Sequence, residues 1–144
     1  MIAVNLDNLA NSQLNYDLIN YINKNKKNWP IFYRNIVPPL MNVDGFVSNF
    51  SDLSGYDGKV LSFDLSSLQT AKNICNGNAD FYLYLYDLEW LYRPINYFYS
   101  LDILRNVKIA CRSETHQKNI ENYCNIKAEI CKDMKEVEEW ITQN

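Results

Sequence analysis

The sequence predicts a domain of the α/β class, in which helices cover both faces of a mostly parallel sheet. Short strand-like runs alternate with helix-like segments along almost the whole chain, which is typical of such three-layer domains. The segments between the runs are also long enough for the helical crossovers that parallel strands require. With 144 residues, 47% of them hydrophobic, the chain is expected to form a single domain over residues 1–144.

Strands are predicted at apolar runs that are bounded by turn residues. Glycine and proline are scarce and fall between the periodic segments, as expected of residues that interrupt strands and helices. The predicted strands are 2–7, 29–35, 44–49, 59–63, 80–86, 107–111 and 126–131. With helices between them, these strands form a Rossmann-like sheet.

Helices are predicted where apolar residues recur at spacings of three and four, at 11–27, 66–77, 97–106, 113–124 and 133–144. Residues that can cap a helix support several of these starts. Ser66 with Gln69 fits a capping box for the second helix, and Asp133 with Glu136 fits one for the last. Ser113 is expected to cap the helix that follows it.

The strand at 80–86 alternates Phe and Leu with Tyr, and two carboxylates, Asp87 and Glu89, follow it. In a three-layer domain, Phe81, Leu83 and Leu85 would pack under helices on one face, with the tyrosines under helices on the other. The competing interpretation is an antiparallel strand whose tyrosine face is exposed to water.

Polar residues follow several predicted strands at the point where each strand ends. Ligands of an open parallel sheet bind outside the carboxyl ends of its strands, and these ends share one edge. The residues placed there are Asp7, Ser48, Asn49, Asp64, Ser66, Asp87, Glu89, Arg112, Ser113 and Glu114. The sequence therefore predicts the functional site at this edge.

Asp87 has two interpretations. It is either a turn or cap residue, or a general base whose pKa is raised because Tyr86 and Trp90 shield it from water. Asp64 ends a neighbouring strand, and two acids at one rim can bind Mg²⁺. Paired acids alone do not define a metal site, so no metal and no cofactor are expected.

Three further residues near this edge each have a structural and a functional interpretation. Ser113 is either a plain helix cap or part of a site for an anionic ligand, which Glu114 in the first turn would repel. His116 is expected at the surface or packed, rather than in acid–base chemistry. Trp90 belongs to an aromatic cluster that either stacks on a sugar or base, or lies in the core or an interface.

Composition and missing motifs argue against several classes of function. The sequence contains neither the G-x-G-x-x-G of dinucleotide binding nor a phosphate-binding P-loop motif. A net charge of -3 argues against nucleic-acid binding. The four cysteines form no C-x-x-C pair and are expected to be buried free thiols in a reducing compartment. Because the chain shows no secretory signal or membrane-spanning run, we expect a cytoplasmic protein that does not enter the membrane.

The run "KVLSFDLSSLQTAKNICNGNADFYLYLYDLEWL", with "NVKIACRSETHQKNIENYCNIKAEIC" after it, resembles the amino-terminal half of GT-B glycosyltransferases. Bacteriophage DNA glucosyltransferases share this layout, including a Tyr-rich strand that runs into an Asp. The resemblance implies that Asp87 is an inverting base and that Ser113 matches the family's helix-capping Ser. The expected ligand is a sugar or sugar nucleotide, near Asp64, Ser66, Glu89, Trp90, Ser113 and Glu114.

GT-B enzymes bind the sugar nucleotide chiefly through a second, carboxyl-terminal Rossmann-like domain. The resemblance therefore implies a separate donor-binding chain or a homo-oligomer. The alternative is a non-catalytic interaction or regulatory module that keeps the fold and binds a partner through Trp90, Tyr92, Tyr97 and Phe98. A third hypothesis, a receiver or flavodoxin-like module, is favoured only by the acid after the first strand, Asp7.

Overall fold

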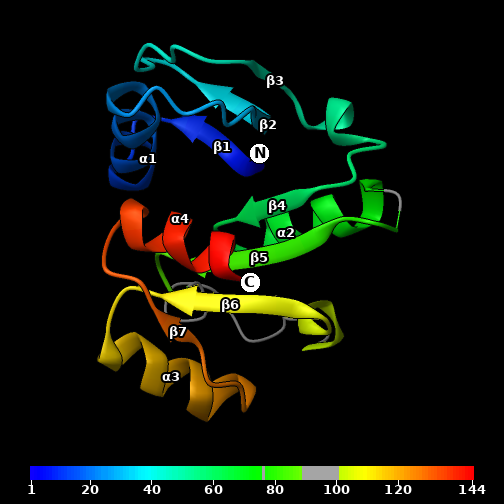
Figure 1. The fold of residues 1–144 in the computed structure, drawn as a ribbon, viewed down its shortest axis with the longest axis vertical. Coiled ribbons are helices and arrows are strands. Elements are labelled where there is room, and N and C mark those ends of the chain that lie inside the picture. Colours follow the sequence, from blue (N-terminus) through cyan, green and yellow to red (C-terminus); the bar gives the residue numbers. More distant parts are fainter. Residues whose placement is uncertain (76, 89–100) are drawn as a thin grey trace.

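The structure, a computed structural model, describes residues 1–75, 77–88 and 101–144. Within these residues, seven strands form one sheet in which all neighbouring strands run parallel (Figure 1). The strands are β1 (Ile2–Ala10), β2 (Ile31–Val37), β3 (Val47–Asn49), β4 (Lys59–Ser62), β5 (Asp80–Leu85), β6 (Val107–Cys111) and β7 (Glu129–Ile130). The predicted α/β class with a parallel, Rossmann-like sheet is confirmed.

Helices cover both faces of this sheet. The α-helices of the described residues are α1 (Gln13–Lys24), α2 (Leu65–Ile74), α3 (Glu114–Cys124) and α4 (Met134–Gln143). Side chains of α1 and α4 share one core cluster with the tyrosines of β5, whereas α2 and α3 share another with its leucines. Figure 1 shows α4 in front of the sheet and α2 behind it. The domain therefore has three layers.

The Tyr-rich strand is buried on both faces, as predicted. Tyr82 and Tyr84 are 0% and 1% exposed, and Leu83 is 0% exposed. The ring of Tyr82 meets that of Trp140 in α4 edge to face, with centroids 5.3 Å apart. Burial of such side chains stabilises the fold by roughly 1.5–3 kcal/mol each. The alternative of an antiparallel strand with a wet tyrosine face is wrong.

The helix starts confirm most predicted caps. The Ser113 hydroxyl accepts a hydrogen bond from the backbone N–H of His116 (3.2 Å) at the start of α3. At α4, Asp133 accepts from the N–H of Glu136 (2.9 Å), and Glu136 in turn accepts from the N–H of Lys132 (2.7 Å). These side chains satisfy donors that would otherwise lack partners inside the helix.

The predicted capping box of Ser66 and Gln69 is wrong, because α2 begins earlier. Asp64 is the cap residue, and its carboxylate accepts from the N–H of Ser67 at 2.6 Å. The strand before it ends at Ser62, so Asp64 is the residue with an extended backbone next to the first turn. A carboxylate there also interacts favourably with the positive end of the helix dipole.

Some element bounds differ from the predicted ones. β1 continues beyond the predicted end at Asp7, because Asn8, Leu9 and Ala10 still pair with β2. β7 spans only Glu129–Ile130 of the predicted 126–131. Of the helix predicted at 97–106, the described part contains a 3₁₀-helix, η4 (Leu101–Leu104). A second one, η1 (Phe50–Leu53), follows β3.

The strand order β3-β2-β1-β4-β5-β6-β7 places a topological switch point between β1 and β4. From β1 the chain enters α1 on one face, and from β4 it enters α2 on the other. The carboxyl ends beside such a switch point are where open parallel sheets bind ligands. In the part of the chain that the structure describes, no helix has the length and apolar character needed to cross a membrane.

Candidate functional site

The residues after β4, β5 and β6 lie along one edge of the sheet, as predicted. Ser62 pairs with Leu83, and Leu85 pairs with Cys111, so the three strands end in succession at that edge. Asp64, Asp87 and Ser113 each follow one of these ends. The sheet therefore brings together the three positions on which the predicted site depends, while their chemical roles remain predictions.

Asp87 forms a loose ion pair with Arg112, from the end of β6. The distance between Asp87 Oδ1 and Arg112 Nη2 is 3.5 Å, and the Asp87 side chain is 65% exposed. Exposed pairs of this kind contribute only about 0–1 kcal/mol to stability. Because the carboxylate is exposed, Tyr86 does not shield it from water in the way that the sequence predicted. The pair leaves Asp87 accessible to a ligand at the edge.

The ring of Tyr86 packs against the guanidinium of Arg112. The guanidinium carbon of Arg112 lies 4.0 Å from the ring centroid of Tyr86, within the range of a cation–π contact. The Tyr86 hydroxyl donates a hydrogen bond to Asp17 Oδ2 in α1 (2.8 Å). Burial and this hydrogen bond raise the pKa of Tyr86 to about 12, so the phenol stays protonated at neutral pH. Asp17, Tyr86, Arg112 and Asp87 thus form a continuous row.

His116 completes this group and is partly buried, in line with the expectation of a surface or packed histidine. Burial and the Arg112 guanidinium lower the pKa of His116, and the Asp87 carboxylate opposes them. Its Nδ1 and the Nε of Arg112 are buried and lack a hydrogen-bond partner among the described residues. Buried polar atoms without partners are uncommon in folded proteins. In the sequence, this grouping is indicated only by position: Arg112 directly precedes the cap Ser113, and His116 follows it by three residues.

The remaining described residues that were predicted to bind substrate lie at helix caps or in first helical turns. The side chains of Asp64 and Ser113 are used as helix caps, which agrees with the plain structural interpretation of Ser113. Ser66 lies in the first turn of α2, where its carbonyl accepts from the Thr70 hydroxyl (3.0 Å). Glu114 is exposed in the first turn of α3.

The predictions for Glu89 and Trp90 lie outside the described residues, as does the proposed aromatic surface of Tyr92, Tyr97 and Phe98.

Two buried polar residues at the switch point were missed by the sequence reasoning. Asn5 of β1 is 1% exposed and Ser62 of β4 is 0% exposed. Asn5 Nδ2 donates to the carbonyl of Ser67 (2.6 Å), which links β1 to the first turn of α2. Asn5 Oδ1 and the Ser62 hydroxyl have no partner in the described part of the chain. The sequence signal that could have indicated this site was Asn5, a polar residue inside the otherwise apolar run of the first strand.

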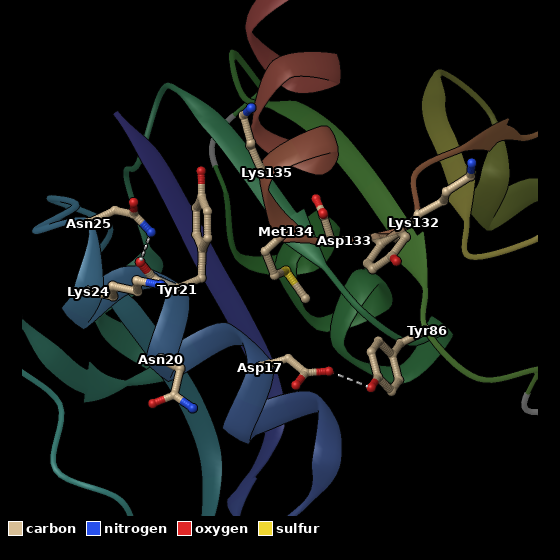
Figure 2. A pocket seen from close by; sticks show the side chains of 11 residues that line it. Asp17, Asn20, Tyr21, Lys24, Asn25, Tyr86, Lys132, Asp133, Met134 and Lys135 are labelled. Atoms are coloured by element: carbon tan, nitrogen blue, oxygen red, sulfur yellow. Dashed lines mark hydrogen bonds between the residues drawn. The ribbon is translucent and has the colours of Figure 1, made fainter.

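A pocket of about 520 Å³ opens beside Tyr86, between α1 and the start of α4 (Figure 2). Its lining residues are Asp17, Asn20, Tyr21, Lys24, Asn25, Tyr84, Tyr86, Lys132, Asp133, Met134 and Lys135. Figure 2 shows the Asp17 carboxylate directed at the Tyr86 hydroxyl, with Asn20, Tyr21 and Lys24 coming from α1 and Met134 and Lys135 from α4. The sequence did not predict this pocket.

The described residues offer little support for metal binding or for a reactive thiol. Residues 1–75, 77–88 and 101–144 contain no group of three His, Cys, Asp or Glu side chains that could hold a metal ion. All four cysteines are free thiols; Cys75, Cys111 and Cys131 are buried, as predicted, whereas Cys124 is partly exposed. Burial and nearby carboxylates raise the pKa of Cys131 to about 12, which keeps it protonated and unreactive.

Comparison with protein-family models, with curated proteins and with solved structures finds no match for this chain. A functional assignment therefore depends on the geometry of the chain itself.

Proposed function

We propose that this domain takes part in glycosyl transfer, as the acceptor side of a GT-B-like pair of domains. The observation that carries this proposal is the exposed carboxylate of Asp87, which follows the buried Tyr-rich strand and lies 3.5 Å from Arg112. The parallel Rossmann-like sheet is the fold that the sequence resemblance implies.

Asp87 is the base in this proposal. In inverting transfer, the acceptor hydroxyl gives its proton to a carboxylate, and its oxygen forms a bond to the anomeric carbon. The bond from that carbon to the donor phosphate breaks, and the phosphate leaves with the electron pair. Positioned general bases contribute about 10²- to 10⁴-fold to such reactions.

Arg112 pairs with this base, and its contact with Tyr86 favours one orientation at the edge. A guanidinium binds phosphate oxygens through two parallel hydrogen bonds, so Arg112 suits the charge that develops on the leaving group. In this proposal the sugar nucleotide is held by a second Rossmann-like unit, either on a partner chain or on another copy.

The test compares sugar-nucleotide hydrolysis and transfer for the wild type, Asp87→Asn and Asp57→Asn, with and without candidate donor-binding partners. Asp57 is an exposed carboxylate just before β4, at the opposite end of the strands, and serves as the matched control. We expect Asp87→Asn alone to lower turnover, by about 10²-fold or more. Equal turnover in all three proteins, or none under any condition, would reject the proposal.

A second candidate, an interaction module, is favoured by exposed apolar side chains near the end of β2. Ile36, Val37 and Leu40 are 44%, 50% and 43% exposed. Ile36 and Val37 pair with the carboxyl-terminal part of β1. This part of β1 extends beyond its pairing with β4. Large apolar side chains that stay exposed near one strand end can mark a contact between proteins.

Size-exclusion chromatography with light scattering tests this candidate. The expected result is a complex or oligomer that Leu40→Lys weakens and the distant Lys118→Gln leaves intact. A protein that stays monomeric and retains no partner would rule it out.

A further inference from the structure

The pocket between α1 and α4 has the size of a small-molecule site. Its volume is about 520 Å³, and pockets that bind small ligands usually measure roughly 300–1,000 Å³. Asp17, Asn20, Tyr21 and Lys24 line it from successive turns of α1, and Met134 and Lys135 line it from α4 (Figure 2). Since these helices pack on the same face of the sheet, the fold itself builds this hollow.

Of the three tyrosines that line the pocket, Tyr21 is partly exposed, whereas Tyr84 and Tyr86 are 1% and 7% exposed. The Tyr84 hydroxyl donates to the carbonyl of Cys131 (2.8 Å). The hydroxyls of Tyr86 and Tyr21 donate to Asp17 and Glu138. Because these polar ends are already bound, the rings are held in fixed positions. The fixed and partly exposed ring of Tyr21 favours a planar ligand that can pack against it.

Three lysines, Lys24, Lys132 and Lys135, line the same pocket. Lys135 pairs with Glu139 at 3.8 Å, and both side chains are more than half exposed. Among the residues described by the structure, no hydrogen bond or ion pair involves the ammonium groups of Lys24 and Lys132. Their charges are therefore available to an anionic group.

Two carboxylates also line the pocket, but both accept hydrogen bonds from the protein. Asp17 accepts from Tyr86 and from Gln13 (2.8 Å each), and Asp133 accepts from the N–H of Glu136. Three lysines against two such carboxylates leave a positive excess, in a chain whose net charge is -3. The pocket thus differs in sign from the molecule as a whole.

We propose that this pocket binds a small planar ligand with an anionic group, of the nucleoside monophosphate class. The base packs against the ring of Tyr21, and the phosphate binds the lysines. Asn20 and Asn25 also line the pocket and supply amide groups for the edge of a base or for ribose hydroxyls. Tyr86 lines this pocket and contacts Arg112, so the occupant lies one side chain away from the edge that carries Asp87.

Isothermal titration of the full chain with AMP, adenosine and inorganic phosphate tests the proposal. We expect saturable binding of AMP, with adenosine and phosphate each at least about tenfold weaker, because each lacks one half of the recognition. Double replacement Lys24→Gln/Lys132→Gln should weaken AMP binding by about tenfold or more. Lys118→Gln, on the exposed surface of α3 across the sheet, should change nothing.

Amide NMR gives an independent location for the ligand. The side-chain NH₂ signals of Asn20 and Asn25 should shift with AMP, and Asp57→Asn, at the opposite end of the strands, should leave the affinity unchanged. Absence of saturable binding, equal binding of adenosine, or an unaltered Lys24→Gln/Lys132→Gln affinity would overturn the proposal. These outcomes concern binding alone, so they are separate from the failure of glycosyl transfer, which is measured as turnover.

Discussion

The guanidinium of Arg112 packs on the ring of Tyr86, with 4.0 Å between its central carbon and the ring centroid. This contact joins the ends of β5 and β6 and brings Arg112 within 3.5 Å of Asp87. His116 responds to both charges, since Arg112 lowers its pKa and Asp87 raises it. The single histidine of the chain is therefore a reporter of this site.

The first prediction concerns the pKa of His116 in two variants. Arg112→Gln removes a positive charge that lowers this pKa, so the pKa should rise toward its ordinary value of 6.5. Asp87→Asn removes a charge that opposes this effect, so the pKa should fall further. An NMR titration of the imidazole protons measures both shifts. Shifts of the same sign in the two variants would contradict the proposed grouping.

The second prediction is a pH dependence of stability that comes from the same histidine. Burial and Arg112 lower its pKa in the folded protein, so the unfolded chain binds the proton more tightly. The contribution is complete above pH 6.5, and the free energy of unfolding decreases as the pH falls from there toward the folded-state pKa. His116→Gln should flatten the curve of unfolding free energy between pH 7.5 and 5.5, measured in urea. An unchanged slope would show that the imidazole titrates alike in both states.

The third prediction concerns the buried hydroxyl of Tyr84. It donates to the carbonyl of Cys131 and so links β5 to the segment that leads into α4. Tyr84→Phe keeps the ring but leaves that carbonyl without this donor, which should cost about 1–3 kcal/mol of unfolding free energy. Tyr16→Phe is the control, because Tyr16 is 52% exposed. Equal effects of the two substitutions would mean that the Tyr84 hydrogen bond contributes nothing.

The sheet could be predicted from the sequence because each strand carries its own local signal. The predicted strand 107–111 matches β6 (Val107–Cys111), and alternation in β5 indicated two covered faces. The start of α2 could not be predicted with the same accuracy. Asp64 and Ser66 are both good cap residues two positions apart, and the end of β4 at Ser62 decides between them.

The candidate site was predictable only as a set of strand ends. Parallel strands bring such ends to one edge, so the positions of Asp64, Asp87 and Ser113 follow from the fold class. The stacking of Arg112 on Tyr86 depends on side-chain rotamers, for which the sequence holds no signal. The pocket depends on α1 and α4 packing on one face, although they are the first and last helices of the chain.

The fourth prediction concerns Glu138, which joins α1 to α4. Lys27 Nζ lies 2.8 Å from Glu138 Oε2, and the Tyr21 hydroxyl also donates to this carboxylate. Burial raises the pKa of Glu138, but the hydrogen bonds from Lys27 and Tyr21 outweigh it and lower the pKa below its ordinary value. Stability from this carboxylate is therefore present above pH 4.5 and is lost as the pH falls below it.

Glu138→Gln should lower the unfolding free energy at pH 7 by about 1–2 kcal/mol, because two donors lose a charged acceptor. It should also reduce the loss of stability below pH 4.5, since the replaced group no longer titrates. Glu139→Gln is the matched control, because Glu139 also lies in α4, its side chain is 56% exposed, and it forms a loose ion pair with Lys135 at 3.8 Å. That control should change stability by less than about 0.5 kcal/mol. If both variants behave alike in urea unfolding at pH 7 and pH 4, the link between α1 and α4 does not depend on Glu138.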